Sequence, residues 1–229
     1  MNETWLITGA GRGIGFALTQ AHLRRGGRVL ASVRGSHSPG LAELITTYSD
    51  RLSVFNFDVR DADAIACATR AVPEPIDVII NNAGVFGPRE PSFRVLDSAG
   101  AIEAFEVNAL GPMKVTAAFL TQLTQAPRPR VVAVSSLMGA MATPGTGSIA
   151  YRISKAALNR AMIAIGEELA PYGIAVACLR PGHVRTDMTS QSAPMTPDES
   201  AAGLLSVIDA LSPAGRTTFL DVTGAQLSW

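Results

Sequence analysis

Tyr151 and Lys155 are the residues of this sequence whose types and spacing best suit proton transfer. They stand four residues apart in a stretch with helical periodicity, so both side chains lie on one face of a helix, about one turn apart. A free tyrosine has a pKa of about 10 and shuttles protons poorly at neutral pH, whereas a neighbouring ammonium group lowers that pKa. The spacing therefore predicts a tyrosine that exchanges a proton with a substrate, assisted by the lysine.

A second chemical pattern is the run Thr-Gly-Ala-Gly-Arg-Gly-Ile-Gly from Thr8 to Gly15. It follows an apolar run and precedes a helical pattern, so its glycines fall in a strand-to-helix turn. Glycine lets the backbone approach a pyrophosphate closely, and the free N–H groups and positive dipole end of the following helix attract the anion. The run predicts a dinucleotide-binding site.

Two arginines bear on which dinucleotide is bound. The second apolar run ends Val33-Arg34, where an acid would bond the ribose hydroxyls of NAD and repel a 2′-phosphate. No acid is present there, and Arg34 and Arg12 offer guanidinium groups suited to bidentate phosphate contacts. The sequence favours NADP(H) over NAD(H).

The elements that position these groups follow from an alternation of short apolar runs with helical patterns. Seven runs predict strands at Trp5–Thr8, Val29–Val33, Leu52–Phe57, Val78–Ile80, Val131–Val134, Ile174–Leu179 and Thr217–Val222. Helices are predicted at Ile14–Arg25, Ala62–Ala71, Ala101–Leu123, Ala150–Leu169 and Glu199–Leu211. This order predicts an α/β protein with a Rossmann-type doubly wound, mainly parallel seven-stranded sheet and helices on both faces. The segment Thr186–Glu199 interrupts the pattern and is expected to be a substrate lid or an ordinary surface loop.

Composition narrows the class of protein. With 229 residues, 47% of them apolar, the chain can bury one sizeable core, which predicts a single domain over residues 1–229. Nineteen basic residues balance nineteen acidic ones, so no overall field favours nucleic acid or an anionic membrane surface. Cys67 and Cys178 lack metal or redox spacing and are expected in the core, with no metal site. No signal peptide or membrane span is visible, so a cytoplasmic protein is expected.

These motifs, in this order, resemble those of the single-domain branch of the short-chain dehydrogenases/reductases. The matching positions are Thr8, Gly9, Gly13 and Gly15 for TGxxxGxG, Asn81–Gly84 for NNAG, Tyr151 and Lys155 for YxxxK, and Pro181–Thr186 for PGxxxT. The resemblance covers nearly the whole chain and implies an NAD(P)-dependent oxidoreductase. The ending Leu220–Trp229 is similar to that of the C-factor/sniffer-like carbonyl reductases.

The resemblance also implies roles for further residues. A serine that bonds the substrate oxygen corresponds to Ser136, with Ser135 as the alternative, and Asn108 corresponds to an asparagine that ties Lys155 to a water chain. Asp58 resembles a carboxylate that accepts from the adenine amino group; alternatively, it caps a helix. The implied catalytic set is Asn108, Ser136, Tyr151 and Lys155. The implied cofactor set is Thr8, Gly9, Gly11, Arg12, Gly13, Ile14, Gly15, Arg34, Asp58, Val59, Asn82, Ala83, Gly84, Tyr151, Lys155, Pro181, Gly182, Val184 and Thr186.

The expected function is NADP(H)-dependent reduction of an aldehyde or ketone, with Tyr151 as proton donor. Oxidation of a secondary alcohol by the same residues is one alternative, and a regulatory protein that binds NADP(H) without turnover is another. The expected substrate wall, which favours an apolar or aromatic carbonyl compound, is Val85, Phe86, Leu137, Met138, Met141, His183 and Met188, although each could equally be core packing. The helical stretches 101–123 and 150–169 correspond to helices that pair between subunits in relatives, so a homodimer or homotetramer is expected.

Overall fold

The protein folds around one parallel sheet, seen in a computed structural model that describes residues 3–213 and 216–229. The strands are β1 Thr4–Thr8, β2 Arg28–Val33, β3 Leu52–Asn56, β4 Val78–Asn81, β5 Arg130–Val134, β6 Ala175–Arg180 and β7 Thr218–Asp221. Their order across the sheet is β3-β2-β1-β4-β5-β6-β7, and every pairing is parallel. The predicted doubly wound seven-stranded sheet is confirmed.

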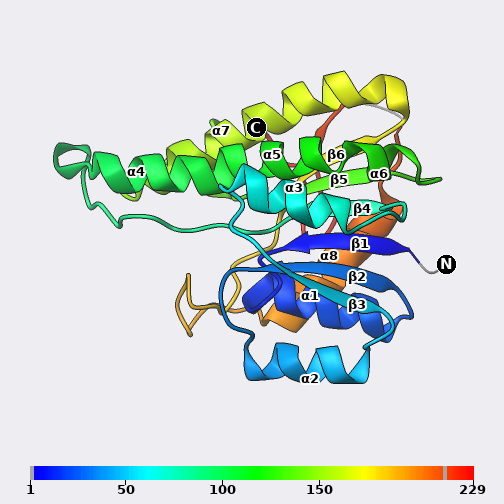
Figure 1. The fold of residues 1–229 in the computed structure, drawn as a ribbon. Helices are drawn as coiled ribbons and strands as arrows, with labels where there is room; N and C mark the ends of the chain where they lie inside the picture. The colour runs from blue at the N-terminus through cyan, green and yellow to red at the C-terminus, as the bar shows by residue number, and fades with distance from the viewer. Residues whose placement is uncertain (1–2, 214–215) are drawn as a thin grey trace.

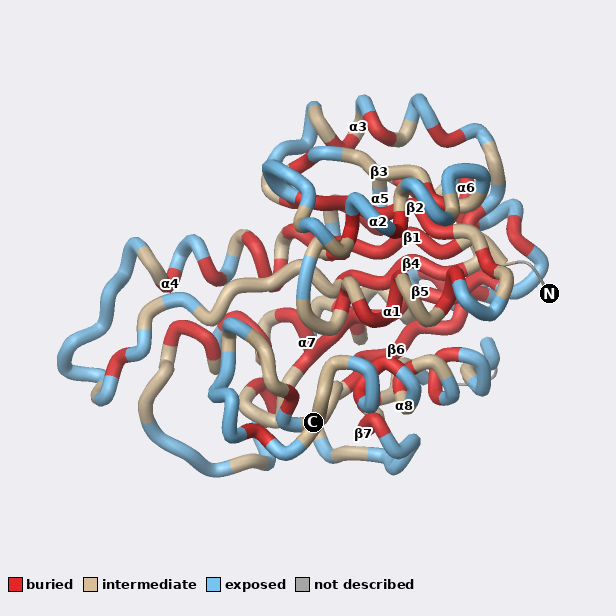
Figure 2. The backbone as a smooth tube through the Cα atoms, turned by 90° about the horizontal axis from the view of Figure 1, so that it is seen from below, coloured by how far each residue is buried: buried red, intermediate tan, exposed pale blue. Residues whose placement is uncertain are grey.

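Helices cover both faces of the sheet (Figure 1). The helices are α1 Gly13–Arg24, α2 Pro39–Thr47, α3 Ala62–Arg70, α4 Ser98–Phe105, α5 Gly111–Ala118, α6 Leu120–Thr124, α7 Ile149–Leu169 and α8 Pro197–Ala210. Successive residues of β1 point to opposite faces, so Leu6 packs in the core beneath α3, α5 and α7, and Ile7 packs in the core above α1 and α8. The central strands form the buried band of Figure 2, as expected for a parallel sheet covered on both sides.

Helix α2 was not predicted from the sequence. Pro39-Gly40 resembles a turn, but the proline occupies the first turn of the helix and Ser38 caps it by accepting from the Leu41 N–H at 3.3 Å. Leu41 and Leu44 are buried against the sheet. The cap and this short apolar stripe are sufficient for a nine-residue helix.

The single helix predicted over 101–123 is wrong in detail. It is divided into α4, a π-helical turn Glu106–Leu110, α5 and α6. Pro112 lacks an N–H and cannot complete a regular helical turn, and a β-carbon on Gly111 would lie 2.7 Å from Val59. The widened turn places Asn108 where a regular helix would not.

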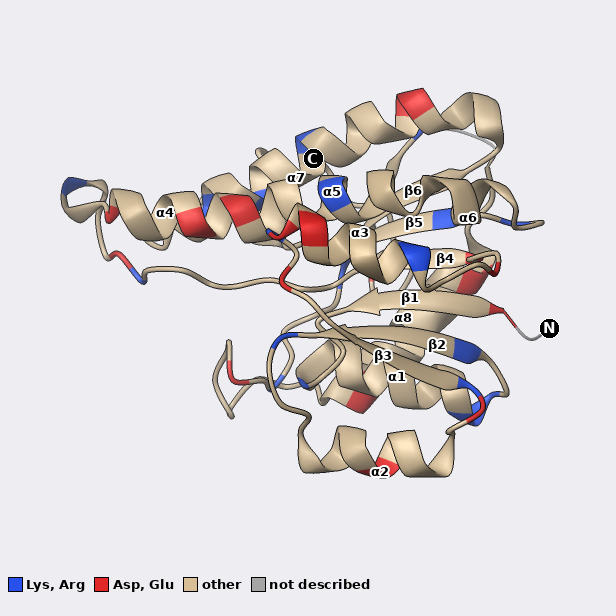
Figure 3. Ribbon diagram, viewed as in Figure 1, with Lys and Arg blue, Asp and Glu red and all other residues tan. Residues whose placement is uncertain are grey.

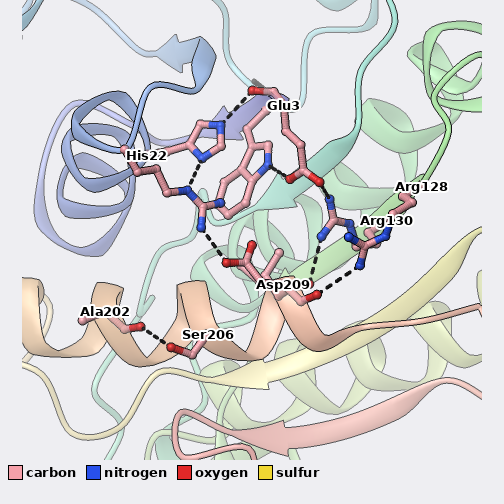
Figure 4. Close-up of polar contacts among 10 residues, drawn as sticks. Glu3, His22, Arg128, Arg130, Ala202, Ser206 and Asp209 are labelled. Carbon is pink, nitrogen blue, oxygen red and sulfur yellow. Dashed lines mark hydrogen bonds and ion pairs between the residues drawn. The ribbon is translucent and has the colours of Figure 1, made fainter. Parts of the chain in front are cut away.

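A polar cluster closes the amino end of the sheet (Figure 4). The buried His22 ring stacks on Trp5 with centroids 4.0 Å apart, and its two nitrogens contact the Glu3 carbonyl and the Arg25 guanidinium, each at 2.9 Å. Arg130, also buried, donates to Glu3 at 2.5 Å. Burial raises the pKa of Glu3, but hydrogen bonds from Trp5 and Arg130 outweigh burial and lower it.

The remaining charged residues lie mainly on the outer helices, in loops and at strand ends (Figure 3). Cys178 is buried in β6, but Cys67 is exposed on the outer side of α3, so the prediction that both cysteines lie in the core is wrong for Cys67. Its neighbours Ile65 and Ala68 occupy the buried face of that helix instead. None of the helices in the described ranges has the length and apolar character needed to cross a membrane.

Candidate active site

A cavity of about 1390 Å³ opens at the carboxyl ends of the strands. Its walls come from the turn after β1, the segments that follow β2 to β5, the start of α7 and the segment that follows β6. The carboxyl edge of a doubly wound sheet is where ligands bind in such folds. The volume exceeds that of a typical drug-sized pocket and leaves room for a dinucleotide together with a small substrate.

The glycine turn is held by the segment that follows β4. The Thr8 hydroxyl accepts from the N–H groups of Asn82 and Ala83, both at 3.0 Å, and the Asn82 amide donates to the Thr8 carbonyl at 2.8 Å. Gly9 has a positive φ of 67°, and a β-carbon on Gly15 would lie 2.4 Å from the Asn82 amide. Thr8 and Gly15 therefore lie behind the cavity wall and shape the turn, while Gly9, Gly11 and Gly13 line the cavity.

Tyr151 and Lys155 lie on one face of α7, both almost fully buried and both lining the cavity. Burial raises the pKa of Tyr151 to about 12, against a smaller lowering by the side chain of Ser136. The lowered tyrosine pKa expected from the sequence is not found in the protein alone. The Lys155 ammonium lies 5.8 Å from the centre of the tyrosine ring and donates to the Val134 carbonyl at 2.8 Å. Burial lowers the pKa of Lys155 to about 8, against an opposing effect of Cys178.

The two serines after β5 differ in what their hydroxyl groups can do. The Ser135 hydroxyl is buried and donates to the Asn159 side chain at 2.5 Å. The Ser136 hydroxyl accepts from the Met138 N–H at 3.1 Å, which leaves its proton free to point into the cavity beside Tyr151. Of the two, Ser136 has the hydroxyl that is available to a substrate.

Asn108 is fully buried and joins the loop after β4 to α7. Its side-chain oxygen accepts from the Val85 N–H, and its amide donates to the Val85 carbonyl, both at 2.8 Å. The amide also donates to the Ser154 hydroxyl at 2.9 Å. Asn108 does not line the cavity or bond Lys155 directly, and its observed contacts hold the segment after β4 against the helix that carries Tyr151.

The end of the cavity beside Tyr151, which is the predicted substrate end, is largely apolar. The Phe86 ring stacks on the Tyr151 ring with centroids 4.5 Å apart and 11° between the planes. The other sequence-predicted wall residues found here are Val85, Leu137, Met138, His183 and Met188. Met141 is not among them: its side chain is 86% exposed, because the chain turns outward after the short 3₁₀ turn Leu137–Gly139. Arg89 also lines this end and was missed from the sequence.

The opposite end of the cavity has the chemistry expected of an adenosine site. Arg34 is 61% exposed and pairs with Asp58 at 3.4 Å, while Arg60 holds the same carboxylate at 2.8 Å. The pKa of Asp58 is held well below its ordinary value, mainly by hydrogen bonds from the Arg60 side chain. Asp61, not Asp58, caps the following helix. Ser36, His37 and Ser38 line this end too, a contribution that no motif in the sequence indicated.

The segment between β6 and α8 lies along the cavity mouth. Thr186 to Gln191 line the cavity, and Asp187 pairs with Arg12 of the glycine turn at 2.8 Å, both side chains being more than 70% exposed. The lid predicted from the sequence, Thr186–Glu199, extends too far at its carboxyl-terminal end. Helix α8 begins at Pro197, with Thr196 and Glu199 forming a reciprocal cap.

The residues present fit a dinucleotide phosphate. The glycine cradle, the unbonded amino end of α1 and the two exposed arginines face one continuous cavity with the predicted nicotinamide contacts Pro181, Gly182, Val184 and Thr186. Ile14, Val59 and Gly84 line it as well. Within the described residues, no group of three or more histidine, cysteine or acidic side chains is arranged to hold a metal ion.

Comparison with known proteins agrees with this geometry. Residues 3–197 match the family model described as short chain dehydrogenase. The C-signal protein of Myxococcus xanthus is 42% identical over 166 residues, which cover 72% of this chain and 99% of that protein. The carbonyl reductase Sniffer of D. melanogaster superposes over the whole of both chains with a TM-score of 0.93 at 26% identity. A carbonyl reductase from Pseudomonas aeruginosa PAO1, crystallised with NADP, also superposes over both whole chains, with a TM-score of 0.85 at 30% identity. The chain therefore belongs to the short-chain dehydrogenase/reductase family of oxidoreductases.

Proposed function

We propose that this protein reduces an aldehyde or ketone to an alcohol with NADPH. The observation that carries the proposal is the buried phenol of Tyr151, which faces the cavity between Ser136 and Phe86. Because burial raises the pKa of Tyr151 to about 12, the phenol is protonated at neutral pH and can act as a proton donor. Two of the structural relatives named above are carbonyl reductases, which supports the same direction of reaction.

Each residue of the site has one task in this proposal. The glycine turn holds the pyrophosphate, and the exposed guanidinium groups of Arg12 and Arg34 exchange their acidic partners for a 2′-phosphate. When bound, the reduced nicotinamide supplies the hydride that reaches the carbonyl carbon. Ser136 donates a hydrogen bond to the carbonyl oxygen, and Tyr151 transfers its proton to that oxygen.

Lys155 and Asn108 support the proton donor. The pKa of Lys155 is lowered by burial to about 8, so its ammonium group can take part in proton supply near neutral pH. Asn108 keeps the loop that carries Phe86 in register with α7. We also propose a homo-oligomer that pairs α4 and α7, whose exposed apolar residues Ile102, Phe105 and Ile153 suit such a contact.

A panel of aldehydes, ketones and quinones, assayed by the loss of NADPH absorbance, tests the proposal. We expect turnover of at least one class. Turnover of secondary alcohols with NADP, and none of any carbonyl compound, would favour the dehydrogenase alternative. Tight binding of NADPH without turnover in either direction would instead favour a regulatory protein.

A further inference from the structure

Arg89 contacts the Phe86 ring, which in turn stacks on Tyr151. Its guanidinium carbon lies 4.1 Å from the centre of the Phe86 ring, and Phe86 stacks on Tyr151 at 4.5 Å. Because Tyr151 occupies one face of Phe86, Arg89 lies over the other face. The stacking holds this exposed arginine at the substrate end of the cavity, where its position is defined.

Arg89 differs from the other cavity arginines in its charge balance. Arg12, Arg34 and Arg180 each pair with an aspartate, namely Asp187, Asp58 and Asp221. Arg185 donates to two carbonyl groups of its own loop. Arg89 donates one N–H to the Met188 carbonyl at 2.6 Å and has no acidic partner among residues 3–213 and 216–229. A positive charge with free planar donors therefore faces the largely apolar end of the cavity.

We propose that Arg89 binds the carboxylate of an anionic carbonyl substrate. This inference rests on the proposed function, which places the reacting carbonyl group at Tyr151. A guanidinium fork matches a carboxylate in two parallel hydrogen bonds, and its attraction is strengthened beside an apolar wall. Since the Phe86 ring separates Arg89 from Tyr151, the carboxylate is remote from the carbonyl group, beyond an aromatic ring or a short chain. The substrate class is a distal oxo-acid rather than a 2-oxo acid, in which the two groups are adjacent.

Binding without turnover gives the first test. The probes are para-(hydroxymethyl)benzoate and its neutral amide, titrated by calorimetry into the NADPH-loaded protein, in which neither probe can react. We expect the acid to bind more tightly than the amide. Arg89→Gln should lower the affinity for the acid by about tenfold or more, which is the scale of one charge-assisted hydrogen bond. The affinity for the amide should change by no more than about twofold. Arg94→Gln is the matched control, because Arg94 lies over an exposed phenylalanine and does not line the cavity.

Equal binding of acid and amide by the unaltered protein overturns the inference. An equal loss of affinity for both probes in Arg89→Gln also overturns it, because this is the result expected if Arg89 only holds the Met188 segment in place. The turnover of para-formylbenzoate is then compared with that of its methyl ester, with NADPH as the reductant in both assays. Selective carboxylate binding without turnover of either compound leaves the anion site in place and refutes the proposed function. Turnover of both compounds with equal kcat/KM, together with non-selective binding, keeps the function and refutes the anion site.

Discussion

At the amino end of the sheet, Glu3, His22 and Arg130 bond one another and their neighbours, whereas at the carboxyl end the hydroxyl groups of Tyr151 and Ser136 face an open cavity. Both ends contain buried ionisable groups. At the amino end, these groups are hydrogen-bonded to other groups of the protein, so their role is to stabilise the fold. At the carboxyl end, the fold leaves polar groups available to a ligand. The difference predicts that substitutions at the two ends have separable effects on stability and on activity.

The largest separable effect is expected at Tyr151. Tyr151→Phe removes the proton donor but keeps the ring that stacks on Phe86, so kcat for carbonyl reduction should fall by roughly a hundredfold or more. The affinity for NADPH and the Tm should stay as in the unaltered protein. Stopped-flow kinetics, fluorescence titration and thermal unfolding measure the three quantities.

Lys155→Ala gives the contrasting control, since it should reduce both the rate and the binding of NADPH. Undiminished turnover in Tyr151→Phe would show that the protein is an enzyme with a different proton donor. A large fall in its Tm would show that the carboxyl end also holds the fold, and the comparison between the two ends would fail.

A smaller effect, on stability alone, is expected at His22. Burial lowers the pKa of His22 to about 4, below its value of about 6.5 in the unfolded chain. Above pH 6.5 the residue is neutral in both states. As the pH falls below 6.5, the unfolded chain takes up a proton that the folded protein does not, so stability is lost down to about pH 4. By pH 5 this loss amounts to about 2 kcal/mol.

Urea unfolding at pH 7.5 and pH 5 measures this loss. In His22→Gln, the difference in unfolding free energy between the two pH values should shrink by that amount, whereas His37→Gln, which removes an exposed histidine, should keep the full difference. Carbonyl turnover at pH 7.5 should be the same in His22→Gln and in the unaltered protein. An unchanged difference in His22→Gln would contradict the link between burial of this ring and acid sensitivity.

The smallest effect is expected at Arg34, where an ion pair of the kind found at the amino end lies at the carboxyl end. The Arg34 side chain is 61% exposed and lies 3.4 Å from Asp58, whose carboxylate also pairs with Arg60 at 2.8 Å, so Arg34 can bind a 2′-phosphate while Asp58 keeps a partner. We expect NADPH to bind about tenfold or more tightly than NADH, and Arg34→Asp to reverse that preference. Titration of nucleotide fluorescence gives both affinities. Arg70→Asp, at the exposed end of α3, is the control, and equal affinities in the unaltered protein would remove Arg34 from phosphate recognition.

The sequence predicted the sheet well because each central strand is a local apolar run. It missed α2, since the cap at Ser38 outweighs a Pro39-Gly40 pair that resembles a turn. It also missed the π-helical turn at Asn108, which depends on the contact between Gly111 and Val59 from a distant segment.

In the candidate site, motifs identified the glycine turn and the Tyr151–Lys155 pair, because both are spacings along one stretch of chain. Met141 could not be placed from its neighbours, because its direction depends on how the chain leaves the 3₁₀ turn after β5. The position of Arg89 depends on stacking between two side chains and on the Met188 carbonyl, 99 residues away along the chain. Contacts between side chains so far apart along the chain leave no periodic pattern in the sequence.

Strand β1 is five residues long and joins the two ends of the molecule directly. Trp5, near its start, packs against His22, and Thr8, at its end, anchors the glycine turn. Residues 188 to 196 follow the predicted nicotinamide contacts along the cavity mouth, and no hydrogen bond in the described structure joins them to Glu3, His22 or Arg130. Substrate preference can therefore diversify over evolutionary time by exchange of these mouth residues, while β1 keeps both the amino-terminal cluster and the glycine turn in place. Libraries for directed evolution are best confined to the same mouth residues.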